Sequence, residues 1–358
     1  MRMLLKVGLI GLAVVVVLVA GLAGYRAVRQ AQAAERQALR GPNAIDEAGF
    51  VRIGGIDQWV SIRGEDRNNP VLVILHGGPG AAFQLIGYEA MRPWERDFTV
   101  VQWDQRGAGR TFGRNGAKGS GELSIDRMAD DGVEVVRHAL ARTGQEKALV
   151  LGASWGSILG VRIARKSPGL LHAYIGAGQV VDMQANEAIG YDGLMARLKA
   201  RGETEAAEQL AAIGPPPYAD MTLLLKERNI LTKHPPESER GLFRNALIAA
   251  LSAPKVRLTD LRDWFQGGSF SVDKLYVPMM AYSDRTGAPV IPVPIVIIQG
   301  DEDIQTPTVL ARAYFDSLQA PSKTWVIVPG GGHNAVFAMP SEFHAALRTH
   351  ARPLALAR

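Results

Sequence analysis

The chain has 358 residues, of which 47% are hydrophobic and 21% charged, so it can bury a substantial core and does not have the composition of a disordered protein. Its formal net charge is +5, but the basic residues are scattered along the chain, which argues against nucleic acid as a partner. It contains no cysteine, which excludes disulfides, thiolate nucleophiles and cysteine-ligated zinc.

Residues 1–42 form a region of their own. After Arg2 and Lys6, residues 7–24 are uncharged and rich in Val, Leu, Ala and Gly. About 18 helical residues reach roughly 27 Å, just enough to cross the hydrocarbon core of a bilayer. We therefore predict an uncleaved single-pass transmembrane helix followed by a helical stalk over residues 25–40, with the membrane as a partner.

Two questions about this region stay open. The segment Gly21-Leu22-Ala23 has the small residues of a signal-peptidase site, so a cleaved signal peptide is the alternative to an anchor. The four arginines at 26, 29, 36 and 40 favour a cytoplasmic position for the rest of the chain by the positive-inside rule. A basic start followed by an apolar segment favours export instead, which we take as the leading expectation.

Residues 43–181 alternate between apolar runs and helical spacings. Two alternating segments joined by Gly54-Gly55 predict a β-hairpin. Residues 126–143 and 158–166 carry the spacing of helices, the first ending at Gly144. Continuous apolar runs predict strands covered on both faces. The predicted strands are residues 50–53, 58–62, 71–75, 99–103, 148–151, 171–176, 294–298 and 324–328.

This order of strands and helices predicts an α/β fold with a mostly parallel sheet and helices on both of its faces. Residues 182–289 interrupt it: they are charged, helical in pattern, and broken by prolines at 215–217 and 235–236. We therefore expect a helical lid over residues 182–289, inserted into one core domain made of residues 43–181 and 290–358.

The pentapeptide Gly152-Ala153-Ser154-Trp155-Gly156 directly follows a predicted buried strand. In this G-x-S-x-G pattern a sharp strand-to-helix turn exposes the serine hydroxyl, and the flanking glycines let the backbone pass through the turn. A glycine-rich structural turn is the alternative. We take Ser154 as the candidate nucleophile.

A serine hydroxyl needs a base, and the base needs an acid that orients it. His333 follows the last predicted strand in a glycine loop, so it is the candidate base. Asp303 follows the preceding strand and is the candidate acid, with Asp301 as the alternative. The chain order Ser, Asp, His is the one that this kind of strand–turn–helix site requires.

The amide of Trp155, after the serine and at a helix N-terminus, is one candidate oxyanion donor. Gly78, in the loop His76-Gly77-Gly78-Pro79-Gly80, is the second, while His76 itself is expected to brace that loop. Neither G-x-x-x-x-G-K-[ST] nor G-x-G-x-x-G occurs in the chain. We therefore expect no nucleotide, no other cofactor and no metal.

Three segments, residues 76–80 (HGGPG), 103–110 (WDQRGAGR) and 152–157 (GASWGS), resemble the proline iminopeptidase group of the α/β-hydrolases. The resemblance covers roughly residues 45–350. It implies an α/β-hydrolase fold, Ser154, Asp303 and His333 as catalytic triad, and the amides of Gly78 and Trp155 as oxyanion hole. It also implies release of an N-terminal residue, often proline, from short peptides.

Enzymes of this group hold the free amine of the peptide with acidic residues of the lid and nearby loops. The resemblance makes Glu187 and Asp192 the candidates here. The N-terminal apolar segment departs from the soluble peptidases of the group. Two alternatives stay open: a carboxylesterase or lactonase on the same fold, and a small-molecule binding protein that keeps the hydrolase fold without turnover.

Overall fold

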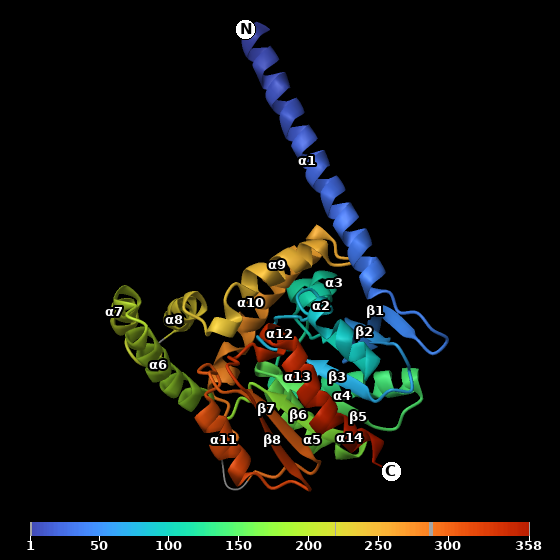
Figure 1. Cartoon of the computed structure of the whole chain (residues 1–358), viewed down its shortest axis with the longest axis vertical. Helices are drawn as coiled ribbons and strands as arrows, with labels where there is room; N and C mark the ends of the chain where they lie inside the picture. The colour runs from blue at the N-terminus through green and yellow to red at the C-terminus, as the bar shows by residue number, and fades with distance from the viewer. Residues whose placement is uncertain (1, 219, 286–288, 358) are drawn as a thin grey trace.

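An eight-stranded sheet forms the centre of the molecule in the computed structural model, which describes residues 2–218, 220–285 and 289–357 (Figure 1). The strand order is β1-β2-β4-β3-β5-β6-β7-β8; β2 is antiparallel to β1 and β4, and the other pairs are parallel. The strands are β1 (Ile45–Ile53), β2 (Ile56–Gly64), β3 (Val71–Leu75), β4 (Thr99–Asp104), β5 (Ala148–Ala153), β6 (Leu171–Ala177), β7 (Ile295–Gly300) and β8 (Lys323–Val328). All the predicted strands are present.

The predicted hairpin is formed by β1 and β2, whose register pairs Ile53 with Ile56. The two residues between them, Gly54 and Gly55, both have positive φ angles, of 53° and 80°. A two-residue turn with positive φ at both positions matches the twist of the flanking strands, and glycine adopts it without strain.

Strands β3 to β7 are buried on both faces, as their continuous apolar runs predict, while the edge strands β1 and β8 are partly exposed. Val71, Val73 and Leu75 of β3 face one core cluster, and Leu72 and Ile74 face the other. This alternation is the period-2 geometry of a strand. The helices outside the insertion are α2 (Tyr88–Met91), α3 (Gly109–Gly119), α4 (Ile125–Thr143), α5 (Trp155–Lys166), α11 (Thr308–Ser317), α12 (Ala335–Ala338), α13 (Pro340–Ala346) and α14 (Arg352–Leu356).

Helix α4 shows how local sequence sets an element's limits. The Ser124 side chain accepts a hydrogen bond from the Arg127 amide and caps the N-terminus. Gly144 is left-handed at the C-terminus and donates back to the Leu140 carbonyl, as the sequence predicts.

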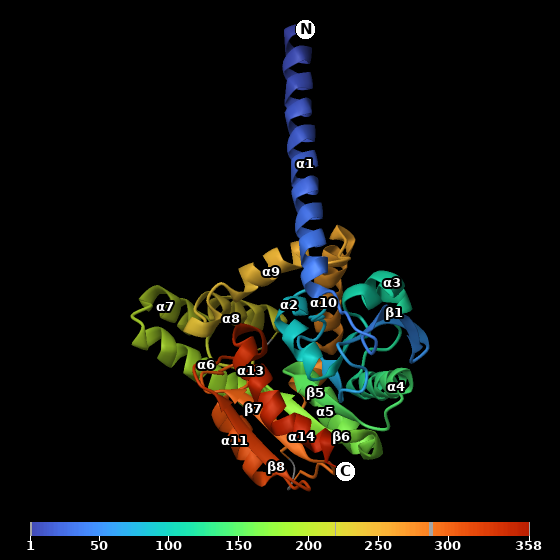
Figure 2. The ribbon, with the colours of Figure 1, turned by 45° about the vertical axis from the view of Figure 1, so that its right-hand side comes forward.

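The insertion between β6 and β7, which we call the lid segment (residues 182–289), contains α6 (Met183–Ala200), α7 (Thr204–Ile213), α8 (Met221–Lys233), α9 (Leu242–Ser252) and α10 (Leu258–Met280). The proline clusters stand just after α7 and α8, where proline cannot continue a helix. Turning the molecule shows α6, α7 and α8 grouped at one side, while α9 extends toward the N-terminal helix (Figure 2).

The N-terminal helix α1 (Arg2–Gln37) is continuous through the predicted apolar segment and stalk and projects away from the rest of the molecule (Figure 1). Its apolar side chains between Val7 and Leu22 are exposed. It is long and apolar enough to cross a membrane, a property that membrane anchors and signal sequences share.

Candidate active site

Ser154 lies at the sharp turn between β5 and α5, as the G-x-S-x-G pattern predicts. Its φ is 51° and its ψ is −123°, a strained conformation for a residue with a side chain. The residue with positive φ in this turn is the serine itself, and neither Gly152 nor Gly156 has a positive φ. The flanking glycines are needed for space: a Cβ on Gly156 would overlap the Leu75 carbonyl oxygen, and one on Gly152 would meet the backbone of Gly156 and Ser157.

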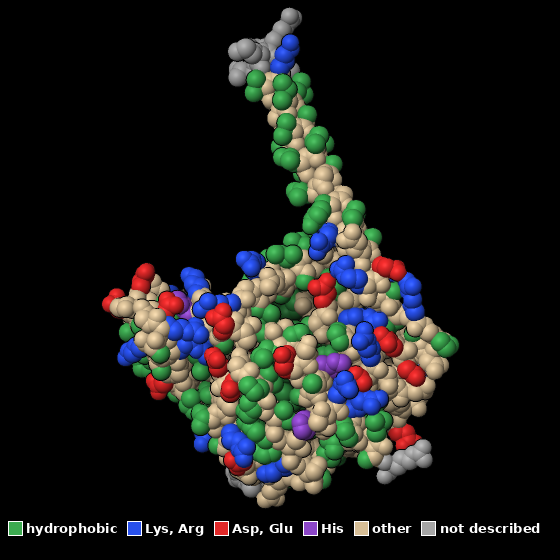
Figure 3. All heavy atoms as spheres, viewed as in Figure 1, with side chains coloured by type: hydrophobic (Ala, Val, Ile, Leu, Met, Phe, Trp, Pro, Cys, Tyr) green, Lys and Arg blue, Asp and Glu red, His purple; other side chains and the backbone are tan. Residues whose placement is uncertain are grey.

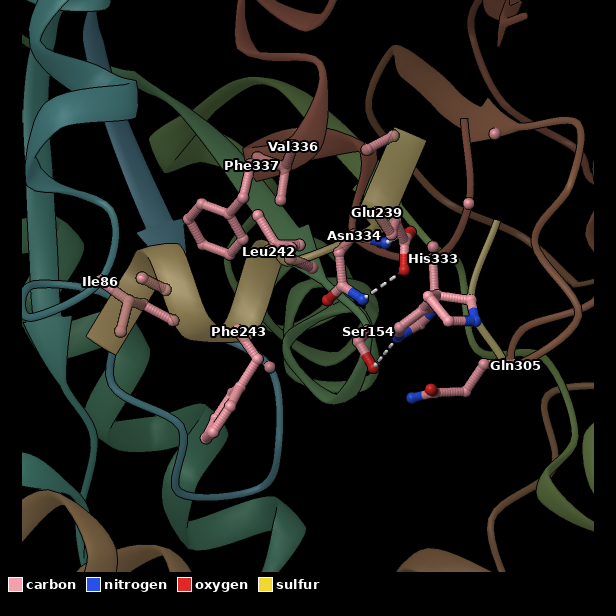
Figure 4. Close-up of a pocket in the computed structure, with 18 of the residues that line it drawn as sticks. Ile86, Ser154, Glu239, Leu242, Phe243, Gln305, His333, Asn334, Val336 and Phe337 are labelled. Carbon is pink, nitrogen blue, oxygen red and sulfur yellow. Dashed lines mark hydrogen bonds between the residues drawn. The ribbon is translucent and has the colours of Figure 1, made fainter. Parts of the chain in front are cut away.

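His333 reaches Ser154 from the loop that follows β8. Its Nε2 lies 3.0 Å from the Ser154 Oγ (Figure 4). Among the other histidines, His138 is in α4, His172 in β6 and His234 in the lid segment. The loop sits tightly on β7, because a Cβ on Gly300 would overlap the Gly331 carbonyl oxygen.

Asp303 lies on the other side of the imidazole. The Nδ1 of His333 is 3.1 Å from Oδ2 of Asp303 and 3.3 Å from Oδ1. The carboxylate also accepts bonds from the amides of Gln305 and Thr306, the Thr306 hydroxyl and the Gln299 side chain. Asp301 is exposed and instead accepts the Gly330 amide at 2.7 Å, so it holds the histidine loop from outside.

These contacts set the protonation behaviour of His333. Burial favours the neutral ring and lowers its pKa, but the Asp303 charge, its hydrogen bond and the Glu239 charge outweigh burial and raise the pKa above the ordinary histidine value. A base with a pKa moved toward neutral pH can take a proton from serine and return it to a leaving group.

The loop of residues 76–80 lies directly beside Ser154. A Cβ on Gly77 would stand 3.2 Å from the Ser154 Cβ, and Gly78 has a φ of +117°. Trp155 is the first residue of α5, so its N–H has no intrahelical carbonyl to bond. Within the described residues the Gly78 N–H likewise has no hydrogen-bond partner. Both amides are therefore available to a bound ligand.

Gln105 connects the three segments that carry the family resemblance. Its side chain donates to the His76 carbonyl at 3.0 Å and accepts from the Trp155 indole at 3.1 Å, and its amide donates to Nε2 of His76 at 3.2 Å. Burial lowers the pKa of His76 to about 4, so the ring is neutral and its Nδ1–H donates to the Gly77 carbonyl. His76 thus braces the loop, as the sequence analysis expects.

A cavity of about 730 Å³ opens over Ser154 and His333. The strand-end loops form its floor, and residues of the lid segment, among them Leu242 and Phe243 of α9, form a wall (Figure 4). Much of the remaining lining is apolar: Phe83, Ile86, Trp264, Val336 and Phe337. The cavity can therefore hold an acyl group or an apolar side chain next to the serine.

The two lid carboxylates suggested by the resemblance are not among the described residues that line this cavity. Glu187, in α6, is buried and paired with the Arg228 guanidinium at 2.6 and 2.7 Å. Asp192 is exposed on the same helix. Neither belongs to the described residues that line the cavity.

Glu239 is the lid carboxylate that does line the cavity (Figure 4). Its Oε1 accepts the Asn334 amide at 2.6 Å and its Oε2 accepts the Asn334 side chain at 3.0 Å, which places it beside the His333 loop. Its role could not be predicted from the sequence, because one acidic residue in a charged insertion has no local signal that separates it from its neighbours. Thr306, which bonds Asp303 and lies 3.2 Å from Nδ1 of His333, could not be predicted either, because a single threonine in a loop carries no local signal of its contacts.

Known proteins resemble this chain in sequence and in fold. A "probable aminopeptidase YbaC" from Bacillus subtilis is 29% identical over 309 residues, which are 84% of this chain and 94% of the relative. A proline iminopeptidase structure from Mycobacterium smegmatis superposes with a TM-score of 0.56 at 20% identity and covers 87% of this chain and 99% of its own.

A structure titled as a membrane phospholipase A and bacterial virulence factor has a TM-score of 0.61 at 18% identity and covers 98% of this chain and 100% of its own. At these identities the solved structures show a common fold. The model of the "Alpha/beta hydrolase family" matches residues 72–346, which include β3 to β8, Ser154, Asp303 and His333. This chain therefore belongs to the alpha/beta hydrolase family.

Proposed function

We propose that Ser154, His333 and Asp303 are the catalytic triad of a serine hydrolase that cleaves amide or ester bonds through an acyl-enzyme, with aminopeptidase activity leading. The observation that carries this proposal is the continuous chain from Ser154 Oγ to His333 Nε2, at 3.0 Å, and from His333 Nδ1 to Asp303, at 3.1 Å. Nucleophile, base and orienting acid lie within hydrogen-bond reach, as the chemistry requires.

In the first step His333 takes the Ser154 hydroxyl proton while Oγ attacks the substrate carbonyl carbon. The oxygen that gains negative charge is stabilised by the amides of Gly78 and Trp155, our proposed oxyanion hole. The imidazolium, held by Asp303, then gives its proton to the leaving amine or alcohol, and the acyl group stays on Ser154. Water, deprotonated by His333, attacks the acyl-enzyme, and the acid is released with the serine restored.

For the aminopeptidase reaction, we propose that Glu239 receives the free α-amine of the substrate. Its carboxylate lines the cavity that contains Ser154 and His333, and two bonds to Asn334 fix its orientation. A carboxylate has about four acceptor positions, so an ammonium group can join the two donors already present. The name of the Bacillus relative supports this substrate class.

A carboxylesterase or lactonase is the second candidate, because aromatic and aliphatic side chains dominate the cavity lining. A solved structure titled as an N-acyl homoserine lactone degrading enzyme shares the fold with a TM-score of 0.57. An ester substrate needs no carboxylate to bind an amine. Replacing Glu239 should therefore impair an aminopeptidase but not an esterase.

The test compares proline p-nitroanilide with p-nitrophenyl butyrate on the full chain. For an aminopeptidase we expect Glu239→Gln to lower kcat/KM on the anilide about 10- to 100-fold, the range of one hydrogen bond to a charged group, and to leave the ester within about twofold. Glu302→Gln is the matched control, since Glu302 also lines the cavity but is exposed. Faster ester turnover, with an anilide rate insensitive to Glu239→Gln, rejects the aminopeptidase and favours the esterase.

We also propose that α1 is an uncleaved single-pass membrane anchor and that the lid segment covers a catalytic core formed by residues 43–181 and 290–358. The exposed apolar stretch of α1 supports the anchor. We expect the protein to stay in the membrane fraction after carbonate extraction. We also expect the mass of the mature chain to include residues 1–24. A shorter mature chain beginning near Gly24 would instead identify a cleaved signal peptide.

A further inference from the structure

Helix α9 exposes four large apolar side chains, Phe243, Leu247, Ile248 and Leu251, which we call the α9 patch. Their exposed fractions are 59%, 37%, 54% and 38%. Phe243, Leu247 and Leu251 are spaced four residues apart, so they form one stripe along the helix. Single exposed apolar residues are ordinary on protein surfaces, but four on one three-turn helix are not.

The opposite side of α9 lines the cavity over Ser154. Leu242, Ala246 and Ala249 line the cavity, and the exposed Phe243, Arg244 and Asn245 also contribute to its lining. Ala250 is buried in a small cluster with Leu85, so the helix is packed in place. Helix α9 therefore separates the substrate cavity from whatever covers the patch.

The C-terminal end of the α9 patch lies against α1, just after the apolar stretch of that helix. Arg26 of α1 donates to the carbonyl oxygens of Leu251, at 3.0 Å, and Val256, at 2.5 Å. Gln30, one turn further, donates to the carbonyl of Val256 as well, at 2.9 Å. Arg26 follows the last large apolar residue of the stretch, Leu22, by one helical turn, about 6 Å.

If α1 crosses a bilayer, these hydrogen bonds determine the depth of the α9 patch relative to the membrane surface. With the apolar stretch in the hydrocarbon region, Arg26 lies at the level of the headgroups, and the end of α9 bonded to it lies at the same level. Figures 1 and 2 both show α9 running sideways from the base of α1. A helix in this position rests along the membrane surface.

The charges around the patch suit a lipid surface. Arg244 lies within the exposed side of α9, Lys255 follows the helix and Arg29 is on the adjacent turn of α1, and all three are exposed. None of them forms an ion pair within the described part of the chain. Apolar side chains beside unpaired cations are the composition of interfacial helices, whose cations bind anionic headgroups. In the space-filling view, hydrophobic side chains line α1 and gather along α9 at its base (Figure 3).

We propose that the α9 patch inserts into the headgroup and upper acyl region of the bilayer that α1 crosses. This inference rests on the proposed anchor. It places the substrate cavity directly beneath a membrane-bound helix, so the enzyme acts on amphiphiles with a cleavable ester or amide that partition into the same bilayer.

The absence of native cysteines makes the test direct, because one introduced cysteine takes one label. The full chain, reconstituted in phosphatidylcholine–phosphatidylglycerol vesicles, carries an NBD fluorophore at Ile248→Cys, at Leu12→Cys in α1, or at Val309→Cys. Val309 is the control, since it is 67% exposed on α11, outside the patch. Spin-labelled lipids with a doxyl group at acyl carbon 5 or 12 then quench any fluorophore that contacts lipid.

We expect the Ile248 label to be quenched at least about twofold by the 5-doxyl lipid, the Leu12 label by the 12-doxyl lipid, and the Val309 label by neither. Quenching at Leu12 without quenching at Ile248 leaves the anchor intact and overturns the α9 proposal, whether water or a second copy covers the patch. Absence of quenching at Leu12 shows that the anchor itself fails, and the α9 proposal fails with it.

A kinetic experiment tests whether insertion of the α9 patch favours substrates that lie in the bilayer. In the same vesicles, Ile248→Asp should lower hydrolysis of bilayer-embedded 4-methylumbelliferyl palmitate about fivefold or more, because a carboxylate opposes insertion. Hydrolysis of the water-soluble butyrate should stay within about twofold, since Ile248 does not line the cavity among the described residues. Val309→Asp should change neither rate. An equal loss on both esters, or no loss on the palmitate, contradicts the proposal.

Discussion

Replacing Gln105 by leucine tests whether the buried hydrogen bonds behind the site position the proposed oxyanion hole. The Gln105 side chain is fully buried, donates to the His76 carbonyl at 3.0 Å and accepts from the Trp155 indole at 3.1 Å. Leucine has a similar volume but makes neither bond, so two buried polar groups lose their partner. Each such group costs about 1–3 kcal/mol, which gives a loss of about 2–6 kcal/mol in the free energy of unfolding.

The same change should also reduce catalysis. His76 precedes Gly77 and Gly78, and the Trp155 amide is the second proposed donor, so both sides of the oxyanion hole lose their support. Removing one such donor outright typically costs 10²–10³ in kcat. For displaced donors we expect kcat to fall about 10- to 100-fold, with a smaller change in KM.

Gln58 provides a matched control. It is also fully buried, accepts from the Trp103 indole at 2.7 Å, and donates to the Ile53 carbonyl at 3.1 Å and to the buried Asp131 carboxylate at 2.9 Å, but it lies outside the lining of the cavity. Urea unfolding followed by tryptophan fluorescence should therefore show a stability loss for Gln58→Leu at least as large as that for Gln105→Leu. Only Gln105→Leu should lower kcat at a temperature where both variants are folded. Equal kcat values for the two variants, or a stability loss below about 1 kcal/mol in Gln105→Leu, would refute the reasoning.

Two further predictions concern the triad. Because the base must be neutral and the pKa of His333 is raised, kcat/KM should increase with pH through a midpoint above the ordinary value of about 6.5. Glu239→Gln removes a charge that contributes to this raised pKa, so the midpoint of the ester pH–rate profile should move to lower pH; an upward or absent shift would contradict the assigned cause. Asp303→Asn should lower kcat about 10³- to 10⁴-fold by disturbing the imidazole, as judged by steady-state kinetics. Asp301→Asn, which affects only the bond to the Gly330 amide, should lower kcat less than about tenfold. A larger loss of kcat in Asp301→Asn than in Asp303→Asn would instead make Asp301 the acid that orients His333.

Most of the sheet could be predicted because its information is local. The β3 run at residues 71–75 is apolar throughout because both of its faces are covered, and the Gly54-Gly55 turn can adopt positive φ at both positions. The proposed triad follows from the same local signals, since Ser154, Asp303 and His333 each stand in the turn or loop after a recognisable strand. Parallel strands end at one edge of the sheet, so residues at their carboxyl ends meet.

Helix α3 could not be predicted, because its sequence GRTFGRNGAKG is rich in glycine and has low helical propensity. It is stabilised from outside. The Asp104 carboxylate accepts the Arg110 amide at 2.9 Å, and the Asp104 carbonyl accepts the Thr111 hydroxyl at 2.5 Å. Burial raises the pKa of Asp104 to about 6, although the bond from Arg110 opposes that rise. Such tertiary support overrides local preference and leaves no periodic signal in the sequence.

The lid carboxylates show a second limit of sequence reasoning. Glu187 and Asp192 are on a predicted helix, but which face of that helix meets the cavity depends on how the lid segment packs. Glu187 pairs with Arg228, 41 positions later in the chain, and this partner could not be chosen from the many arginines in the sequence. Glu239 reaches the cavity because its bonds to Asn334 join the lid segment to the loop after β8. Long-range pairings of this kind place the charged groups of the lid segment and are not encoded locally.

The central claim, that Ser154 is a nucleophile activated by His333, is tested most directly by labelling the full chain with a fluorophosphonate probe and locating the adduct by peptide mass spectrometry. Our account predicts one adduct, on the peptide that contains Ser154, and none in Ser154→Ala. It also predicts that His333→Ala slows labelling by at least about 10³-fold, since the unassisted hydroxyl is a poor nucleophile. An unlabelled wild-type protein, or equal labelling of Ser154→Ala, would contradict the account and favour a binding protein that keeps the hydrolase fold without turnover.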